Sequence, residues 1–267
     1  MTDGSYIRYV ALGDSQTEGV GDGDDYTGLR GWADRLAERL AHDNPGVSYA
    51  NLAVRGKLAR QIRTDQLAAA VAMRPDLATV LAGMNDLLRP NFDPDEIIGH
   101  VEVMFAALTE AGAKVATFTF PDVGRMIPLA RPLRGRIVAL NDRIRAAARR
   151  YGVIVAETAD HAAVYDPRLW SPDRLHASPQ GHQLIADSLA HALRLPGSDD
   201  SWTRPLPPLP YEPNVLSELA AEFRWAGTAL SPWVMNRIRG RSSGDYRKPK
   251  RPLPLPVRLS GDLRVTR

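Results

Sequence analysis

The sequence contains the residue types that transfer of an acyl group to a serine requires, spread over four separate segments. Such a reaction needs a hydroxyl nucleophile, a base to take its proton, a group that orients the base, and donors for the oxyanion. Ser15 offers the hydroxyl, and Asp173 and His176, three residues apart, could lie on one side of a tight loop or helical turn. There Asp173 could hold one ring nitrogen of His176 while the other faces Ser15. Gly56 could donate a backbone N–H that no side chain obstructs, and Asn85 could donate from its amide.

Each of these groups also has an ordinary structural explanation. A serine after Gly-Asp can cap a helix or bind a phosphate, and Asn85 can form an Asx turn. Gly56 can simply begin a helix, and an Asp–His pair at this spacing can be a solvated ion pair. The carboxylates of Asp14 and Asp86 are expected to hold their turns by accepting from nearby backbone N–H groups. What favours catalysis is that four turns, in chain order, each offer a group that the same reaction needs.

The hydrophobic pattern places three of these turns at the ends of buried strands. Residues 7–12 form a short apolar run that a glycine ends, which is typical of a strand in a parallel sheet. Further strands are predicted at 47–52, 77–81, 114–120 and 153–156, and helices at 32–40, 58–73, 93–111, 134–150 and 178–193. This alternation predicts an α/β protein, a three-layer α/β/α sandwich of the flavodoxin-like type with a five-stranded parallel sheet. Ser15, Gly56 and Asn85 would then lie at the carboxyl ends of strands, where such sheets bind ligands.

Four blocks of the sequence resemble those of the SGNH/GDSL hydrolases, a family of esterases and lipases. They are Gly13-Asp14-Ser15, Asn51-Leu52-Ala53-Val54-Arg55-Gly56, Gly83-Met84-Asn85-Asp86 and Asp173-Arg174-Leu175-His176. The resemblance covers about residues 7–195 and implies the SGNH hydrolase fold. It also implies that Ser15 is the nucleophile, His176 the general base and Asp173 its orienting acid. The oxyanion donors would be the backbone N–H groups of Ser15 and Gly56 and the amide of Asn85, whereas Gln16 and Met84 occupy positions that the family varies freely.

The resemblance implies serine-dependent hydrolysis of carboxylic esters through an acyl-enzyme, with no cofactor. A small or short-chain ester of the acetyl type is the expected substrate, because no long apolar insertion lies near the expected cleft. The same triad would serve a lysophospholipase, a thioesterase or an acyltransferase, and these remain alternatives. A catalytically inactive module that binds a ligand or partner is a further alternative, although it would have no need of the Asp173–His176 pair. A metal-dependent phosphoesterase is disfavoured, because no histidine-rich cluster has the spacing of metal ligands.

Composition and charge narrow the function further. The absence of cysteine excludes disulfides, thiolate metal sites and a cysteine nucleophile. The net charge of +3 hides a basic end, since residues 237–267 carry ten basic and two acidic residues. Contact of this end with nucleic acid or an acidic membrane is a minor alternative, so no nucleic-acid partner is expected. The N-terminus lacks a signal-peptide pattern and the most apolar region, 67–84, is interrupted by charges and proline, which predicts no membrane span and a cytoplasmic location.

The chain is predicted to divide into a catalytic domain, 1–195, and an extension, 196–267. Eleven of the 21 prolines fall between Pro196 and Pro256, which indicates an extended linker. Short helices are predicted at 215–230 and from Ser231-Pro232, followed by a basic tail whose last residues are expected to be mobile. Residues 19–25 are expected to form a rim or lid of the cleft. His182 is expected either at the surface or close to the site without contacting the substrate.

Overall fold

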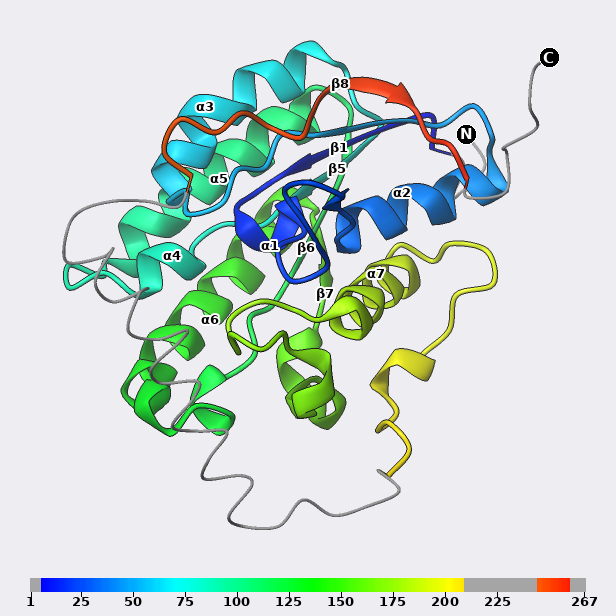
Figure 1. The fold of residues 1–267 in the computed structure, drawn as a ribbon. Helices are drawn as coiled ribbons and strands as arrows, with labels where there is room; N and C mark the ends of the chain where they lie inside the picture. The colour runs from blue at the N-terminus through cyan, green and yellow to red at the C-terminus, as the bar shows by residue number, and fades with distance from the viewer. Residues whose placement is uncertain (1–5, 209–243, 260–267) are drawn as a thin grey trace.

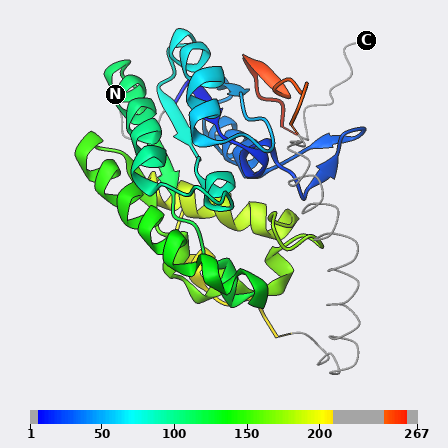
Figure 2. The same ribbon diagram turned by 90° about the vertical axis from the view of Figure 1, so that its left-hand side faces the viewer.

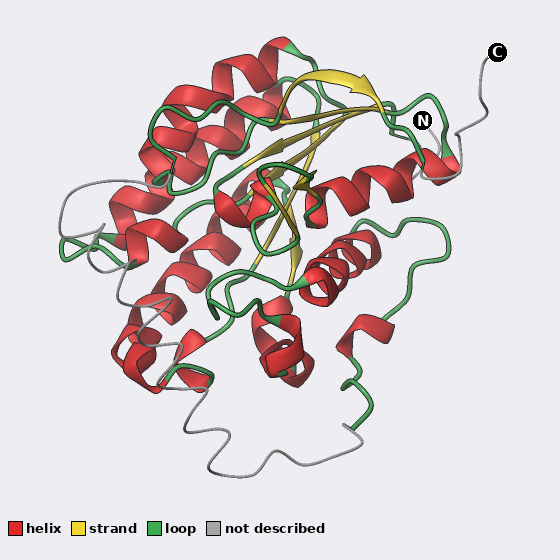
Figure 3. Ribbon diagram, viewed as in Figure 1, coloured by secondary structure: helices red, strands yellow, loops and turns green. Residues whose placement is uncertain are grey.

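A six-stranded sheet forms the centre of the molecule (Figures 1 and 3). The computed structural model describes residues 6–208 and 244–259. The strands lie in the order β7-β6-β5-β1-β4-β8, and all neighbours are parallel except β4 and β8. Their bounds are β1 Arg8–Leu12, β4 Ser48–Asn51, β5 Leu77–Val80, β6 Lys114–Phe118, β7 Ile154–Ala156 and β8 Arg251–Pro256. The five predicted parallel strands are therefore confirmed, and β8 adds an antiparallel sixth.

Helices cover both faces of the sheet. α2 (Trp32–Asp43) and α7 (Pro179–Ala192) pack together on one face, and α3 (Ala59–Ala72), α5 (Pro94–Glu110) and α6 (Arg134–Tyr151) lie on the other (Figure 1). The turned view shows α5 and α6 side by side (Figure 2). This is the three-layer α/β/α arrangement that the alternation of strands and helices predicts.

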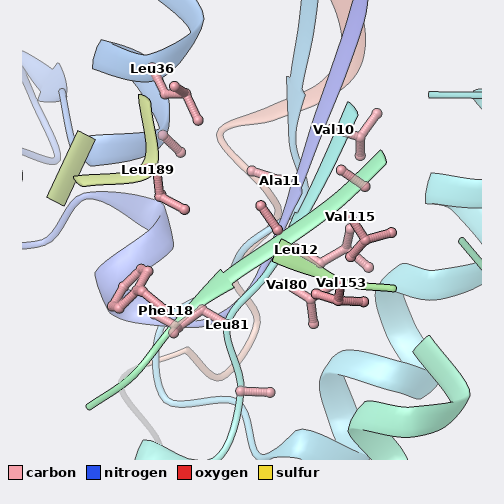
Figure 4. Close-up of a cluster of buried hydrophobic side chains, with 14 of the residues drawn as sticks. Val10, Ala11, Leu12, Leu36, Val80, Leu81, Val115, Phe118, Val153 and Leu189 are labelled. Atoms are coloured by element: carbon pink, nitrogen blue, oxygen red, sulfur yellow. The ribbon is translucent and has the colours of Figure 1, made fainter. Parts of the chain in front are cut away.

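β1, the strand that leads to Ser15, lies within the hydrophobic core. Tyr9 to Leu12 are fully buried, because β1 lies between two strands and beneath helices on both faces. Leu36 of α2 and Leu189 of α7 lie on one side of the sheet, and Val80 and Val115 lie on the other (Figure 4). The turn that follows β1 is thus anchored to fully buried residues of the core.

Two of the predicted helix starts have the expected caps. Asp93 accepts from the backbone N–H groups of Asp95 and Glu96, with Pro94 as the first residue of α5. Ser178 accepts from the Gly181 N–H, and α7 begins at Pro179. The α7 cap matters for the site, because it fixes where the preceding loop with His176 ends.

The predicted strand 114–120 is too long by two residues. β6 ends at Phe118, and the side chain of Asn141 then binds both backbone groups of Phe120, at 2.9 Å to its N and 2.8 Å to its O. A side-chain amide that takes both groups replaces the neighbouring strand, so the ladder stops there.

The expectation that the last residues are mobile is wrong for Arg251–Pro256, which form β8. β8 pairs with β4, and the N–H of Val257 donates to the carbonyl of Val47 at 3.1 Å. Pairing is possible despite the prolines because β8 is an edge strand, where only one side of the backbone needs donors. The short helices predicted after residue 214 lie outside the described residues.

Two further pairs of short segments complete the description. β2 (Gly23–Asp24) and β3 (Gly28–Leu29) form a small antiparallel hairpin after α1 (Ser15–Glu18), and α4 (Met84–Leu87) follows β5. None of the helices in the described part of the chain combines the length and apolarity that crossing a membrane requires.

Candidate active site

Ser15 begins α1 directly after the central strand. Gln66 holds the turn by accepting from the Gly13 N–H and donating to the Gly13 carbonyl, both at 2.9 Å. A side chain at Gly13 would collide with Thr17, so this close approach requires glycine. Asp14 caps α1 by accepting from the Gln16 N–H at 3.2 Å. Ser15 is thus a half-buried residue at the start of a helix, with its own N–H outside the hydrogen-bond ladder of that helix.

The loop of residues 170–177, called the histidine loop below, is built around the carboxylate of Asp173. One oxygen accepts from the Ser171 hydroxyl at 2.7 Å and from the N–H groups of Leu175 and His176 at 2.8 and 2.9 Å. The other oxygen lies 2.6 Å from His176 Nδ1. Burial alone would raise the pKa of Asp173, but the hydrogen bonds from His176 and Ser171 outweigh it and hold that pKa far below its ordinary value. Asp173 is therefore ionised and fixes the ring of His176 through Nδ1, which leaves Nε2 for another partner.

Asn85 lies on α4, in the turn that follows β5. Its amide nitrogen donates to Asp14 Oδ2 at 3.0 Å and to the carbonyl of Lys57 at 3.1 Å. Gly56, with φ of 77°, occupies the turn just before Lys57, so the Asn85 amide binds the residue next to it. Burial raises the pKa of Asp14 to about 6, against the opposing effect of its hydrogen bond from Gln16.

A cavity of about 110 Å³ brings three of the predicted site residues together. Ser15, Asn85 and His176 line it, whereas Gly56 does not. Most of the remaining wall is aliphatic or aromatic: Leu81, Leu87, Phe118, Phe120, Val123, Val164, Leu169, Leu175, Leu184 and Ile185. The polar groups of the sequence motifs thus face a pocket suited to an apolar ligand.

Gln16 is a residue whose role the sequence did not reveal. Its Nε2 donates to the Leu175 carbonyl at 2.9 Å, and its Oε1 accepts from the Ala177 N–H at 3.3 Å. Both partners flank His176 in the chain. A glutamine carries no catalytic signature, so only its position directly after Ser15 could have drawn attention to it.

His182 is fully buried, which excludes the surface position and leaves the other alternative, a place close to the site. Its Nδ1 accepts from the Trp32 N–H at 3.2 Å, and its Nε2 donates to the Val20 carbonyl at 3.1 Å. Burial lowers the pKa of His182 to about 4, because it penalises the charged ring. His182 is a neutral link between α2, α7 and the loop after α1, and it does not line the cavity.

Residues 19–25, predicted as a rim or lid, pack behind the histidine loop. A side chain at Gly21 would collide with the Ala177 carbonyl and approach His176 Cβ to 3.3 Å. The carboxylate of Asp25 binds Arg55 at 2.9 Å and Arg247 at 2.7 Å. In the described structure none of residues 19–25 lines the cavity. The loop therefore braces the histidine loop from outside.

Metal ligation finds no support in the side-chain arrangement. Across residues 6–208 and 244–259, no three or more His, Asp or Glu side chains form a group that could hold a metal ion. The acidic groups nearest Ser15 have protein partners, since Asp14 accepts from Asn85 and Asp86 accepts from the Ala59 N–H at 2.9 Å. As expected, both carboxylates also bind backbone N–H groups in or near their turns.

The sandwich, its serine turn after the central strand and its Asp–His loop at the same edge are the architecture of the SGNH hydrolases. The sequence matches the model of the GDSL-like Lipase/Acylhydrolase family over residues 11–184, and the chain belongs to that family. It is accordingly a carboxylic ester hydrolase.

Solved structures with the same fold include several esterases. TesA is 20% identical with a TM-score of 0.58, and the alignment covers 70% of this chain and 98% of that one. Axe2, an acetylxylan esterase from Geobacillus stearothermophilus, is 17% identical with a TM-score of 0.59, covering 76% and 99%. The psychrotrophic esterase EstA from Pseudoalteromonas sp. is 16% identical with a TM-score of 0.55, covering 70% and 97%. At these identities the likeness concerns the fold. No curated protein sequence matches the chain.

Proposed function

We propose that the chain hydrolyses carboxylic esters through an acyl-enzyme on Ser15, with His176 as general base and Asp173 as the group that orients it. The observation that carries the proposal is the 2.6 Å contact between Asp173 and His176 Nδ1, in a loop whose histidine lines the same cavity as Ser15. A base held at Nδ1 by a carboxylate keeps Nε2 free to take a proton. This is the arrangement that activates a serine hydroxyl.

The reaction proceeds in two steps. In the first, Ser15 Oγ bonds to the acyl carbon as His176 Nε2 takes its proton, and the alcohol leaves with that proton. In the second, His176 takes a proton from water, the hydroxide attacks the acyl carbon, and Ser15 recovers its proton as the acid leaves. No cofactor takes part in either step.

The N–H group of Ser15 and the amide of Asn85, both on residues that line the cavity, would stabilise the oxyanion; the N–H group of Gly56, the third donor that the family resemblance implies, belongs to a residue outside the cavity wall. In enzymes of this kind one such donor contributes roughly 2.7–4 kcal/mol to the transition state. The Asn85 amide already binds Asp14 and the Lys57 carbonyl, so the oxyanion has to compete with them. The oxyanion is a stronger acceptor than the Lys57 carbonyl and, because its charge sits on one oxygen, also than the Asp14 carboxylate, which favours the exchange as the charge develops.

Because the wall of the cavity is mostly apolar, an uncharged, apolar acyl group fits it best. We propose a small or short-chain acyl group as the natural one. A lysophospholipid or a thioester, or transfer of the acyl group to an alcohol instead of water, would use the same residues.

The decisive experiment replaces Ser15 by alanine and follows both ester turnover and labelling by a fluorophosphonate. Ser15→Ala should lose both, with an unchanged circular dichroism spectrum and melting temperature. Ser201→Ala, an exposed serine far along the chain, is the matched control and should keep both. Full activity of Ser15→Ala would refute the proposal, and a folded wild-type protein that is neither labelled nor active would favour the binding module.

A further inference from the structure

The side chain of Gln16 joins the serine turn to the histidine loop. Its amide binds the Leu175 carbonyl and the Ala177 N–H, the peptide groups on either side of His176. Among the described residues, these two hydrogen bonds are the ones that connect residues 13–19 with residues 171–178. Ser15 and His176 are 161 positions apart in sequence, so their relative placement depends on such cross-links.

We propose that Gln16 is a positioning residue that sets the place of His176 relative to Ser15. The inference rests on the proposed function, in which His176 takes the proton of Ser15. Gln16 is the residue after the nucleophile, on the same first turn of α1. A rigid link from this turn to the backbone of His176 fixes the base and the nucleophile to one another.

The two hydrogen bonds of the link hold the chain on both sides of His176. The Gln16 Nε2 donates to the carbonyl of the residue before it, and the Gln16 Oε1 accepts from the N–H of the residue after it. Because both hydrogen bonds come from one planar group, they constrain the direction of the His176 Cα–Cβ bond as well as its distance.

The other constraints on the histidine loop act on different parts of it. Asp173 holds the ring of His176 and the N–H groups within the loop, so it fixes the shape of the loop. Gly21 packs against the outside of the loop by contact alone. Gln16 supplies what these do not, which is a directional bond between the loop and the element that carries Ser15.

Three variants separate the two hydrogen bonds from packing. Gln16→Met keeps the length and volume of the side chain and removes both bonds. Gln16→Asn keeps the amide and shortens its reach by one methylene. Gln16→Glu keeps the acceptor for Ala177 and turns a carboxylate oxygen toward the Leu175 carbonyl, which repels it. Gln183→Met, the same change at an exposed position of α7, is the control.

The experiment measures kcat and KM for p-nitrophenyl acetate per site titrated with a fluorophosphonate. Gln16→Met and Gln16→Asn should lower kcat on the order of 10- to 100-fold, because a misplaced base impairs the chemical step, and should change KM much less, although Gln16 also lines the cavity. Hydrogen exchange of the Ala177 N–H should become faster in Gln16→Met. Gln16→Glu should lose at least as much kcat as Gln16→Met, because its carboxylate repels the Leu175 carbonyl. Gln183→Met should resemble the wild type in each measurement.

Two results would overturn the proposal. One is a kcat per titrated site in Gln16→Met equal to that of the wild type. The other is a loss of activity that only follows a fall in the folded fraction, with kcat per titrated site unchanged. These results are distinct from failure of the proposed function, which would appear as an active Ser15→Ala variant.

Discussion

The amide of Asn85 lies 3.0 Å from the carboxylate of Asp14, which joins the turn after β5 to the turn after β1. Asp14 is 2% exposed, so its carboxylate lies in the protein interior, where it caps α1 and also accepts from Asn85, a proposed oxyanion donor. A buried carboxylate prefers its neutral form, and the raised pKa of Asp14 expresses that preference. The free energy of unfolding should therefore depend on the pH at which Asp14 loses its proton.

Asp14 should make the protein less stable as pH rises from about 4 to about 6. In that range the unfolded chain loses the Asp14 proton at the ordinary pKa of 3.8, whereas the folded chain retains it up to about 6. The free energy of unfolding falls by at most about 3 kcal/mol from this group and levels off above pH 6. Urea unfolding of wild type and Asp14→Asn at several pH values between 4 and 8 measures this, and the difference between the two should shrink toward low pH. Parallel pH dependences would contradict the assignment.

His182 should act in the opposite direction. The unfolded chain takes up a proton at the ordinary pKa of 6.5, while the folded chain resists protonation until about pH 4. The free energy of unfolding should therefore fall as pH is lowered from about 7 to 4, by on the order of 3 kcal/mol. In His182→Asn the free energy of unfolding should not show this fall at low pH. In His42→Asn, a substitution of an exposed histidine, the fall should remain. If the free energy of unfolding of His182→Asn fell by the same amount at low pH, another group would be responsible.

Asp173→Asn should abolish most of the ester turnover without unfolding the histidine loop. The asparagine oxygen can still accept from Ser171 and the two N–H groups, but its NH₂ would face Nδ1 and favour the wrong tautomer of His176. A loss of kcat on the order of 10²- to 10⁴-fold is expected, with KM little changed. Ser171→Ala removes one donor to Asp173 and should cost far less. If the two variants lost equal activity, the carboxylate would not be the orienting group.

Two glycines should respond to alanine in opposite ways. Gly99 lies within α5 with open space around the position of a Cβ, so Gly99→Ala should stabilise the protein by about 0.5–1 kcal/mol through helix propensity. Gly21 has φ of 105° and no room beside the Ala177 carbonyl, so Gly21→Ala should cost about 1–3 kcal/mol. It should also lower kcat, because it pushes on the histidine loop. Thermal unfolding and turnover of p-nitrophenyl acetate measure both effects.

A series of p-nitrophenyl esters from C2 upward tests the proposed substrate class. We expect the highest kcat/KM with short acyl chains, since a chain that overfills the cavity must force its packed wall apart. Leu184→Trp should narrow the preference further, because Leu184 lines the cavity. A maximum at long chains would contradict the short-chain proposal while leaving ester hydrolysis intact.

The sequence predicts the fold well where local patterns determine it. In the parallel sheet, β1, β5 and β6 are each followed within three residues by a glycine or proline, and the caps Asp93 and Ser178 mark helix starts by their types alone. It also predicts that Ser15 and Asn85 line one cavity, because they follow the neighbouring strands β1 and β5.

Contacts between distant segments could not be predicted in this way. The hydrogen bonds of Gln16 depend on the path of a loop about 160 residues later, and a glutamine fits many surroundings. The burial of His182 depends on the contact between α2 and α7, and the hydrophobic pattern of neither helix indicates which helix it contacts. β8 was missed because its prolines argue against a strand, and only its place beside β4 makes them acceptable.

The alternation in β8 has a consequence for self-association. Three of the six residues of β8, Pro252, Pro254 and Pro256, have no backbone N–H, and the carbonyl of Val47 binds the N–H of the following Val257. The strand thus offers few N–H donors to a second molecule, which discourages edge-to-edge aggregation. A chain shortened before residue 244 would instead present the bare backbone of β4, and we expect it to aggregate even if its catalytic groups remain in place.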